Sequence, residues 1–212
     1  MEIVFNLIEF EQNNERTYSR NGVATGYLSE LHAGKKIFFF KRKFQSFYFP
    51  NDEELTVKPL ILIGSGTGIA PFMSFLRSKA EKTEILNNVL LFLGIRDSNK
   101  DFLFKDELCN FYSKYLKYFS VSYSRSLEGA QYNYSKSKYV YESLNHFSAE
   151  ISKLVYEKNA YIYVCGGTKM SKDVFNALAK SLNEEMKINI EDSEKYLLEM
   201  VKNKRYKQDI WA

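Results

Sequence analysis

Three glycines spaced two residues apart, Gly64, Gly66 and Gly68, follow an apolar run and precede Pro71. Glycine lets a backbone approach a ligand closely and adopt positive φ, and proline is favoured at the first position of a helix. The free N–H groups and the dipole of such a helix favour an anion. The run is not the Rossmann fingerprint, because residue 69 is Ile, and it lacks the Gly-Lys-Ser/Thr of a P-loop. On spacing alone, a pyrophosphate site and a plain strand–helix turn explain it equally well.

Two cations, a hydroxyl and a thiol follow three later apolar runs. Arg96 follows the second run, Ser124 and Arg125 follow the third, and Cys165 follows the fourth. Guanidinium and hydroxyl groups suit the binding of a phosphate. Each group also has an ordinary explanation, because a single Arg is commonly solvated and a lone Cys is more often a small buried apolar residue.

Four continuous apolar runs, each followed by a helical segment, must position these groups. We expect buried strands at residues 60–63, 89–93, 119–123 and 160–164, and helices from about residue 71 and near 104–117, 140–157 and 171–185. Strand–helix alternation of this kind predicts an α/β fold with a doubly wound parallel sheet. Such sheets bind ligands at the carboxyl ends of their strands.

The first 58 residues have a different pattern. Apolar and polar residues partly alternate, which is typical of strands with one exposed face. We expect strands at residues 2–10, 37–40 and 44–49, a short helix at 27–31 and a turn at 32–36.

The composition is that of an ordinary globular chain. Its 212 residues, 45% apolar and 26% charged, suit one large domain or two small ones with a buried core. A net charge of +4 is too small to predict binding to nucleic acid or to an anionic membrane. No run approaches the ~20 apolar residues of a membrane helix, and two Cys favour a reduced, intracellular compartment. His32 and His146 lack metal-ligand spacing, so we expect no metal.

Seven segments resemble, in order, the motifs of one known family. Residues 64–72 resemble G-x-G-T-G-[IV]-A-P-[FL]. The others are 22–25 (G-V-[AC]-[TS]), 93–108 (G-C-R, then D-[FY]-[LI]-[FY]-x-[DE]-E-L), 123–125 ([AF]-[FY]-S-R), 139–140 (the start of Y-V-Q), 161–166 ([IF]-Y-V-C-G-D) and 205–211 (R-Y-x-x-D-[VI]-[WF]). The family is the ferredoxin–NADP reductase superfamily, and within it the diflavin reductases: the cytochrome P450 reductase, sulfite reductase flavoprotein, methionine synthase reductase and nitric oxide synthase reductase types. The chain is similar to their C-terminal NADPH-binding region over nearly its whole length.

The resemblance implies a role for each matching residue. The implied NADPH-binding residues are Gly66, Thr67, Gly68, Arg96, Ser124, Arg125, Tyr139 and Lys138, with Lys136 as an alternative to Lys138. The implied residues beside the FAD pyrophosphate are Gly22, Val23, Ala24 and Thr25. The implied catalytic residues are Cys165, near the reacting carbon of the nicotinamide, Asp209, and Trp211, which stacks on the flavin and acts as a gate.

Three departures from the family pattern stand out. Gly167 replaces an Asp and Tyr141 replaces a Gln. The family's FAD motif R-x-Y-S-x-x-S is missing, since residues 16–19 match only its beginning and lie in the wrong place. We therefore expect the chain to be the C-terminal piece of a longer reductase, inactive alone. Residues 1–58 would be the tail of an antiparallel FAD-binding barrel and residues 59–212 the NADP-binding domain.

The resemblance implies a flavin-dependent reductase in which a hydride passes from NADPH to FAD. Electrons then pass through FMN to an acceptor protein such as a cytochrome P450. The expected cofactors are NADP(H), FAD and FMN, and the expected location is the cytoplasm, or the cytoplasmic face of the endoplasmic reticulum if a missing N-terminus carries an anchor. Two alternatives stay open: a single-flavin ferredoxin–NADP reductase-type enzyme, and a nucleotide-binding module without redox activity.

Overall fold

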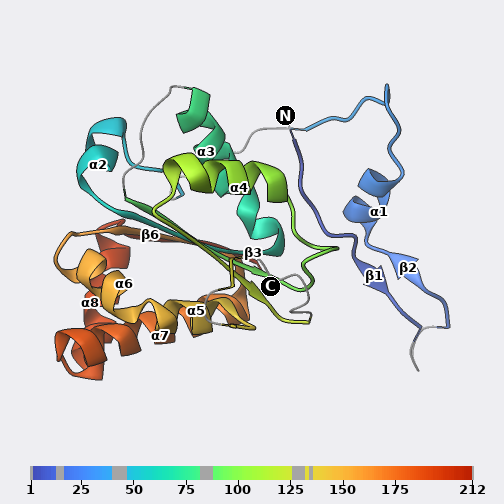
Figure 1. Ribbon diagram of the computed structural model, residues 1–212. Coiled ribbons are helices and arrows are strands. Elements are labelled where there is room, and N and C mark those ends of the chain that lie inside the picture. Colours follow the sequence, from blue (N-terminus) through green and yellow to red (C-terminus); the bar gives the residue numbers. More distant parts are fainter. Residues whose placement is uncertain are drawn as a thin grey trace. The chain divides into compact units, whose positions relative to one another are not determined.

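The structure of the chain is a computed structural model that describes residues 2–12, 17–39, 47–81, 88–125, 132–133 and 136–211 (Figure 1). The chain divides into two compact units, residues 1–44 and 45–212. Each unit is described by itself.

A five-stranded parallel sheet forms the centre of the larger unit, with the strand order β5-β4-β3-β6-β7. The strands are β3 (Leu60–Ser65), β4 (Val89–Ile95), β5 (Tyr118–Tyr123), β6 (Tyr161–Gly167) and β7 (Tyr206–Trp211). The four strands expected from the apolar runs are present, and the expected α/β parallel sheet is confirmed.

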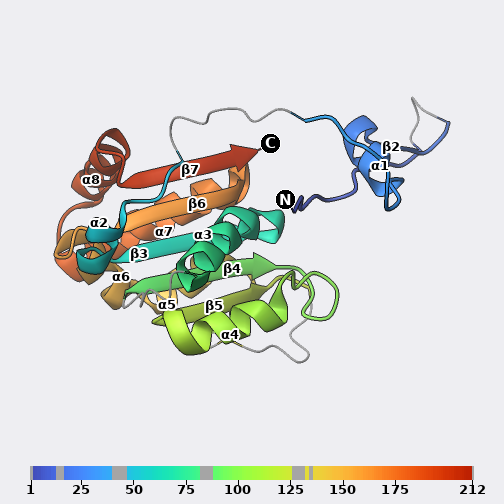
Figure 2. The ribbon, with the colours of Figure 1, turned by 90° about the horizontal axis from the view of Figure 1, so that it is seen from above.

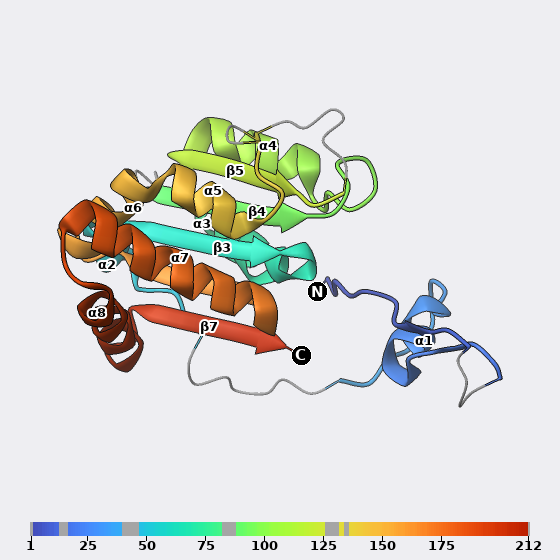
Figure 3. The same ribbon diagram turned by 90° about the horizontal axis from the view of Figure 1, so that it is seen from below.

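Helices cover both faces of the sheet. Figure 2 shows α3 (Ala70–Glu81) and α4 (Lys105–Tyr115) across one face. Figure 3 shows the other face, whose helices are α5 (Val140–His146), α6 (Ser148–Tyr156), α7 (Thr168–Met186) and α8 (Ile190–Lys202). Alternate strand residues supply the two cores, so that Leu60 and Leu62 pack under α3 while Ile61 and Ile63 pack under α7. This burial on both faces explains why the strands are continuously apolar.

Two parts of the C-terminal half differ from the sequence-based expectation. The helix expected near 140–157 is two helices, because Phe147 has non-helical dihedrals (φ −103°, ψ 21°). Helix α8 and strand β7 were not predicted as elements. Among the described strands, β7 pairs with β6 alone, and Tyr206 is its single buried residue, so it has no continuous apolar run.

The prediction of a strand at 44–49 is wrong for residues 47–49, which form no strand. Residues 44–46 lie outside the described residues. Phe47 and Phe49 instead pack against the sheet, and the ring of Phe49 stacks on Tyr163 with 4.6 Å between centroids. The helix α2 (Asp52–Val57) follows, and Asn51 caps it by accepting the Glu54 N–H at 2.9 Å. Residues 47–58 thus belong to the compact unit of the sheet, while the division at 58/59 into FAD-binding and NADP-binding domains stays a prediction.

The smaller unit contains little regular structure. It has β1 (Glu9–Phe10) paired antiparallel with β2 (Arg20–Asn21), then α1 (Val23–Ser29). The strand expected over residues 2–10 is therefore only two residues long, the short helix begins four residues before the expected 27, and residues 37–39 form no strand. Residue 40 lies outside the described residues. Among the described residues of this unit Gly26 alone is buried, so no core holds a longer strand in place.

None of the helices in the described ranges combines the length and the apolar character that crossing a bilayer requires.

Candidate functional site

The carboxyl ends of the five parallel strands meet at one edge of the sheet, here called the carboxyl edge. Along it the strands follow the order β5, β4, β3, β6, β7. Neighbouring strands lie ~4.8 Å apart, so the two outer strands are separated by about 19 Å. Most of the residues singled out in the sequence follow these strand ends, and the edge therefore brings them into one row.

The glycine turn stands at the middle of this row, after β3. Residues Gly66–Ile69 form a single 3₁₀ turn (η1) that leads directly into α3. Gly66 has φ +53°, and a side chain added there would meet open space. At Gly68 an added Cβ would lie 2.1 Å from the carbonyl oxygen of Cys165 and 3.3 Å from the Trp211 ring. The turn is therefore open at Gly66 and tightly packed at Gly68, which suits a backbone cradle for a phosphate group.

Backbone hydrogen bonds hold the two arginines side by side. The Arg125 N–H donates to the Arg96 carbonyl at 2.9 Å, and the Ser124 N–H donates to the Ile95 carbonyl at 3.0 Å. The ends of β4 and β5 are thus fixed against each other beyond the regular ladder. Arg96 and Arg125 are exposed at this part of the edge, where both charges can face a ligand.

The segment 136–139 is fixed beside the end of β5. The Tyr123 N–H donates to the Ser137 carbonyl at 3.2 Å, and the hydroxyls of Ser122 and Ser137 share a buried hydrogen bond of 2.8 Å. The Lys138 N–H donates to a Glu142 carboxylate oxygen at 2.7 Å. The backbone of Lys138 and Tyr139 therefore lies near the end of β5, which Ser124 and Arg125 follow. The role of these residues, and the choice between Lys138 and Lys136, stay predictions.

Arg96 has a partner that the sequence analysis missed. Its guanidinium makes two hydrogen bonds with the Asp101 carboxylate, Nε to Oδ2 at 3.2 Å and Nη2 to Oδ1 at 3.1 Å. The Arg96 side chain is 57% exposed. A phosphate that binds Arg96 must therefore compete with a carboxylate already in place. A sequence signal existed, since Asp101 begins the second half of the 93–108 motif.

A buried thiol and an exposed carboxylate face each other at the other end of the row. Cys165 in β6 is paired in register with Asp209 in β7. Burial, and then the negative charge of Asp209, raise the pKa of the Cys165 thiol from 9.0 to about 12. The thiol therefore stays protonated at neutral pH, and it is a packing group rather than a nucleophile.

Trp211 closes the row at the end of β7. It pairs in register with Gly167, and its carbonyl accepts the Thr168 hydroxyl at 3.2 Å. The Trp211 side chain is 41% exposed, and its ring contacts the position that a Gly68 side chain would occupy. The structure thus places Gly68, Cys165, Asp209 and Trp211 together.

Residues 22–25 lie in the smaller unit, which is described by itself. Gly22 is the N-cap of α1, and Val23, Ala24 and Thr25 form the first turn of this helix. The Ile8 N–H donates to the Thr25 hydroxyl at 3.1 Å, and the Gly22 N–H donates to the Ile8 carbonyl at 2.7 Å. These contacts shape the helix start, and the role of the segment at FAD stays a prediction.

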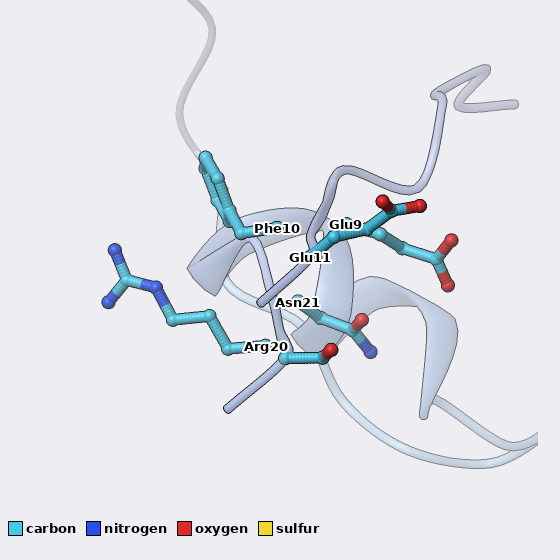
Figure 4. Close-up of a pocket in the computed structure, with 6 residues that line it drawn as sticks. Glu9, Phe10, Glu11, Arg20 and Asn21 are labelled. Carbon is cyan, nitrogen blue, oxygen red and sulfur yellow. The ribbon is translucent and has the colours of Figure 1, made fainter. Parts of the chain in front are cut away.

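A hollow of ≈ 380 Å³ lies elsewhere, in the smaller unit (Figure 4). Exposed side chains line it, namely Glu9, Phe10, Glu11, Ser19, Arg20 and Asn21. The carboxylates of Glu9 and Glu11 would repel a polyanionic nucleotide. We therefore keep the carboxyl edge as the candidate site.

The parallel sheet and the glycine turn after β3 are an arrangement that suits nucleotide binding, and comparison with known proteins identifies the class of domain. The family model of the oxidoreductase NAD-binding domain matches residues 62–176, more than half of the chain. The chain belongs to this family.

Its relatives are diflavin reductases of the ferredoxin–NADP reductase superfamily. The chain is 33% identical to methionine synthase reductase of Rattus norvegicus. The alignment is 237 residues long and covers 100% of this chain and 33% of that protein. Methionine synthase reductase of Homo sapiens is also 33% identical. The sulfite reductase [NADPH] flavoprotein alpha-component of Mannheimia succiniciproducens is 33% identical over 97% of this chain and 32% of its own length.

The comparisons confirm the family and the main cofactors expected from the sequence. The family is one that binds a nicotinamide dinucleotide, and the relatives are flavoproteins, which supports NADP together with FAD and FMN. The chain spans about a third of the length of the relatives it matches.

Proposed function

We propose that the carboxyl edge binds NADPH and that this chain is the NADPH-binding module of a diflavin reductase. The order of groups along the edge carries the proposal. Cations and hydroxyls stand at β5, the glycine turn stands at β3, and a neutral thiol with an aromatic ring stands at β6 and β7. The parts of NADPH have the same order: a 2′-phosphorylated adenosine, a pyrophosphate and a nicotinamide.

The β5 end of the row suits the 2′-phosphate. A phosphate dianion needs fixed cations and hydroxyl donors, and Ser124, Arg125, Lys138 and Tyr139 supply them on a backbone held by hydrogen bonds. We assign Lys138 rather than Lys136 to this role, because Glu142 fixes the Lys138 backbone. Arg96 would bind on the pyrophosphate or adenine side after leaving Asp101.

The glycine turn suits the pyrophosphate. The residues Gly66, Thr67 and Gly68 present backbone N–H groups at a helix start, where the dipole favours negative charge. Gly66 leaves the space in front of the turn open, and Gly68 lets the turn press against the Cys165 carbonyl. The site can therefore hold two phosphates close to the sheet.

The β6–β7 end suits the nicotinamide. When bound, NADPH supplies a hydride, which is chemistry of the cofactor and not of the protein. Cys165 is a buried neutral group below this end, Asp209 places a negative charge beside it, and the Trp211 ring lies next to Gly68. In a reductase that contains FAD, Trp211 would cover the flavin and move aside for the nicotinamide, which makes it a gate.

The whole protein would pass the hydride to FAD beside residues 22–25, and single electrons through FMN to an acceptor protein. A cytochrome P450 is one candidate acceptor, which would make the protein an NADPH–hemoprotein reductase. Methionine synthase is another candidate acceptor, because relatives named methionine synthase reductase match the whole chain. Two free cysteines support a reducing, cytoplasmic compartment.

The flavin content of the intact protein that carries this chain separates the alternatives. FAD together with FMN supports a diflavin reductase. FAD alone would favour a single-flavin ferredoxin–NADP reductase-type enzyme, and the absence of any flavin would favour a nucleotide-binding module without redox activity.

Calorimetric titration of the chain with NADP⁺ and NAD⁺ tests the binding proposal. We expect NADP⁺ to bind more tightly, and Arg125→Ala to weaken NADP⁺ binding while NAD⁺ binding stays unchanged. One charge-assisted hydrogen bond contributes ~1.5–3 kcal/mol, which corresponds to roughly 10- to 150-fold in affinity.

Lys202→Ala is the matched control, because Lys202 is an exposed cation next to the amino end of β7, at the opposite edge of the sheet. It should change neither affinity. An equal loss for both nucleotides in Arg125→Ala would refute the assignment of Arg125 to the 2′-phosphate.

A further inference from the structure

Two tyrosine rings stack at the β5 end of the carboxyl edge. The centroids of Tyr139 and Tyr141 lie 5.9 Å apart and their planes differ by 8°. Residues two apart within a helix do not face each other. The rule does not apply to Tyr139, because Tyr139 is the N-cap of α5 and has extended rather than helical dihedrals (φ −121°, ψ 151°). The chain turn at the helix start thus brings the two rings together.

Tyr139 needs such support because it is otherwise open. Its side chain is 53% exposed, and its backbone joins the segment that stands beside Ser124 and Arg125. An exposed side chain keeps several rotamers and loses their entropy when it binds a ligand. A ring stacked behind Tyr139 restricts it before the ligand arrives.

The residue that follows Tyr141 fixes the backbone of the same segment. The Glu142 carboxylate accepts the Lys138 N–H at 2.7 Å and the Tyr139 N–H at 3.5 Å. The segment that carries the Tyr139 ring is therefore held at its backbone, and the stacked Tyr141 ring restrains the side chain.

We propose that Tyr141 is a positioning residue that sets the preference for a 2′-phosphorylated nucleotide. It restrains the Tyr139 ring by stacking against it, so that the ring is ready for the phosphate before the ligand binds. The inference rests on the proposed NADPH site. It assigns a function to a residue that departs from the Gln of the family motif.

The test compares Tyr141→Phe, which keeps the ring, with Tyr141→Gln, which removes the ring and keeps a polar side chain. Tyr156→Ala is the matched control, because Tyr156 is an exposed tyrosine in a ring pair with Tyr196 that lies before the amino end of β6. Calorimetry gives the affinities for NADP⁺, 2′,5′-ADP and NAD⁺, and circular dichroism confirms folding. Tyr141→Leu replaces the Gln variant if that variant does not fold.

We expect Tyr141→Gln to weaken NADP⁺ and 2′,5′-ADP binding by about 2- to 13-fold, the range of one aromatic pair, with NAD⁺ unchanged. Tyr141→Phe should keep most of the selectivity, and Tyr156→Ala all of it. Unchanged affinities in Tyr141→Gln, or an equal loss for NADP⁺ and NAD⁺, would overturn the proposal. If Arg125→Ala is selective while Tyr141→Gln is not, only the role of Tyr141 fails. If neither is selective, the NADPH site fails as well.

Discussion

The two ends of the carboxyl edge differ in exposure and charge. At the β5 end, Arg125 and Lys138 are exposed, and Tyr139 is 53% exposed. At the β6–β7 end, Cys165 is 1% exposed and Gly68 packs directly against its carbonyl oxygen. The first end can discriminate between ligands by charge, whereas the second has a buried neutral thiol beside the half-exposed ring of Trp211. Under the proposed function, recognition of the 2′-phosphate and the chemistry of the nicotinamide are separated along one row.

The position of each strand in the sheet explains this difference. Strand β5 is one of the two outer strands. Irregular chain adds hydrogen bonds beyond it, from the Val121 N–H to the Tyr132 carbonyl at 2.9 Å and from the Tyr123 N–H to the Ser137 carbonyl at 3.2 Å. Strand β6 lies between β3 and β7 and is buried along six of its seven residues. A central strand therefore ends in a dry environment, and an outer strand ends in an open one.

The largest expected effect tests the dryness of the β6 end. In a Cys109→Ser variant, Cys165 is the single cysteine, and its pKa is raised from 9.0 to about 12. At pH 9 the thiolate fraction should be about 500-fold lower than that of an ordinary cysteine, and labelling by a thiol reagent should slow accordingly. The measurement compares the labelling rates of the native and the denatured variant. Equal rates would mean that Cys165 is open to water.

The same shift predicts loss of stability at alkaline pH. The folded-state pKa lies above the unfolded one, so the unfolded chain loses its proton first as pH rises. The contribution of the protonated thiol to stability is complete below pH 9 and disappears as pH approaches about 12. Denaturant melts across this range should decline less steeply for Cys165→Ala. An identical decline would contradict the shift.

The next effect tests the tight packing at Gly68. An added Cβ in Gly68→Ala would lie 2.1 Å from the Cys165 carbonyl oxygen, so the turn or β6 must shift. Overpacking of this kind costs about 1–3 kcal/mol of unfolding free energy. The affinities for NADP⁺ and NAD⁺ should fall together, because both contain the pyrophosphate.

Gly167→Ala is the matched control for Gly68→Ala. Gly167 has φ −74°, and its added Cβ meets nothing within 4 Å. Denaturant melts should show a change below about 0.5 kcal/mol, as for ordinary surface substitutions. Equal destabilisation by both substitutions would show that the contact at Gly68 is not special.

The smallest expected effect tests which part of the nucleotide Arg96 binds. The Asp101 carboxylate is hydrogen-bonded to the Arg96 guanidinium, so Asp101→Asn should make this guanidinium available to a phosphate. An exposed ion pair contributes ~0.2–1 kcal/mol, which corresponds to an affinity gain of roughly 1.4- to 5-fold. The gain should be equal for NADP⁺ and NAD⁺ if Arg96 faces their shared part. A gain for NADP⁺ alone would move Arg96 to the 2′-phosphate.

The sequence predicted the larger unit better than the smaller one for a physical reason. Strands buried on both faces consist of consecutive apolar residues, and such runs predicted β3, β4, β5 and β6. Strand β7 lies at the outside with mostly exposed residues, so it carries no such run. The alternating pattern of residues 2–10 did not form a long strand, because no described residue of that segment is buried.

The sequence also predicted some features of the candidate site and missed others. Residues that follow buried strands were brought together as expected, because parallel topology aligns the strand ends. The Arg96–Asp101 pair was missed although Asp101 begins the second half of the 93–108 motif, because an ion pair near the surface leaves no periodic signal. The Tyr139–Tyr141 stack depends on the exact residue at which α5 begins, and sequence patterns locate helix ends only within a few residues.

The fluorescence of Trp211, the single tryptophan of the chain, tests the separation along the carboxyl edge most directly. Trp211 ends β7, whereas the groups assigned to the 2′-phosphate stand at β5. Titration with 2′,5′-ADP, which lacks the nicotinamide, should reach saturation without changing the emission of Trp211. Titration with NADP⁺ should change it, because the nicotinamide reaches the β6–β7 end. An equal change with both ligands, or saturation by NADP⁺ without any change, would contradict the account.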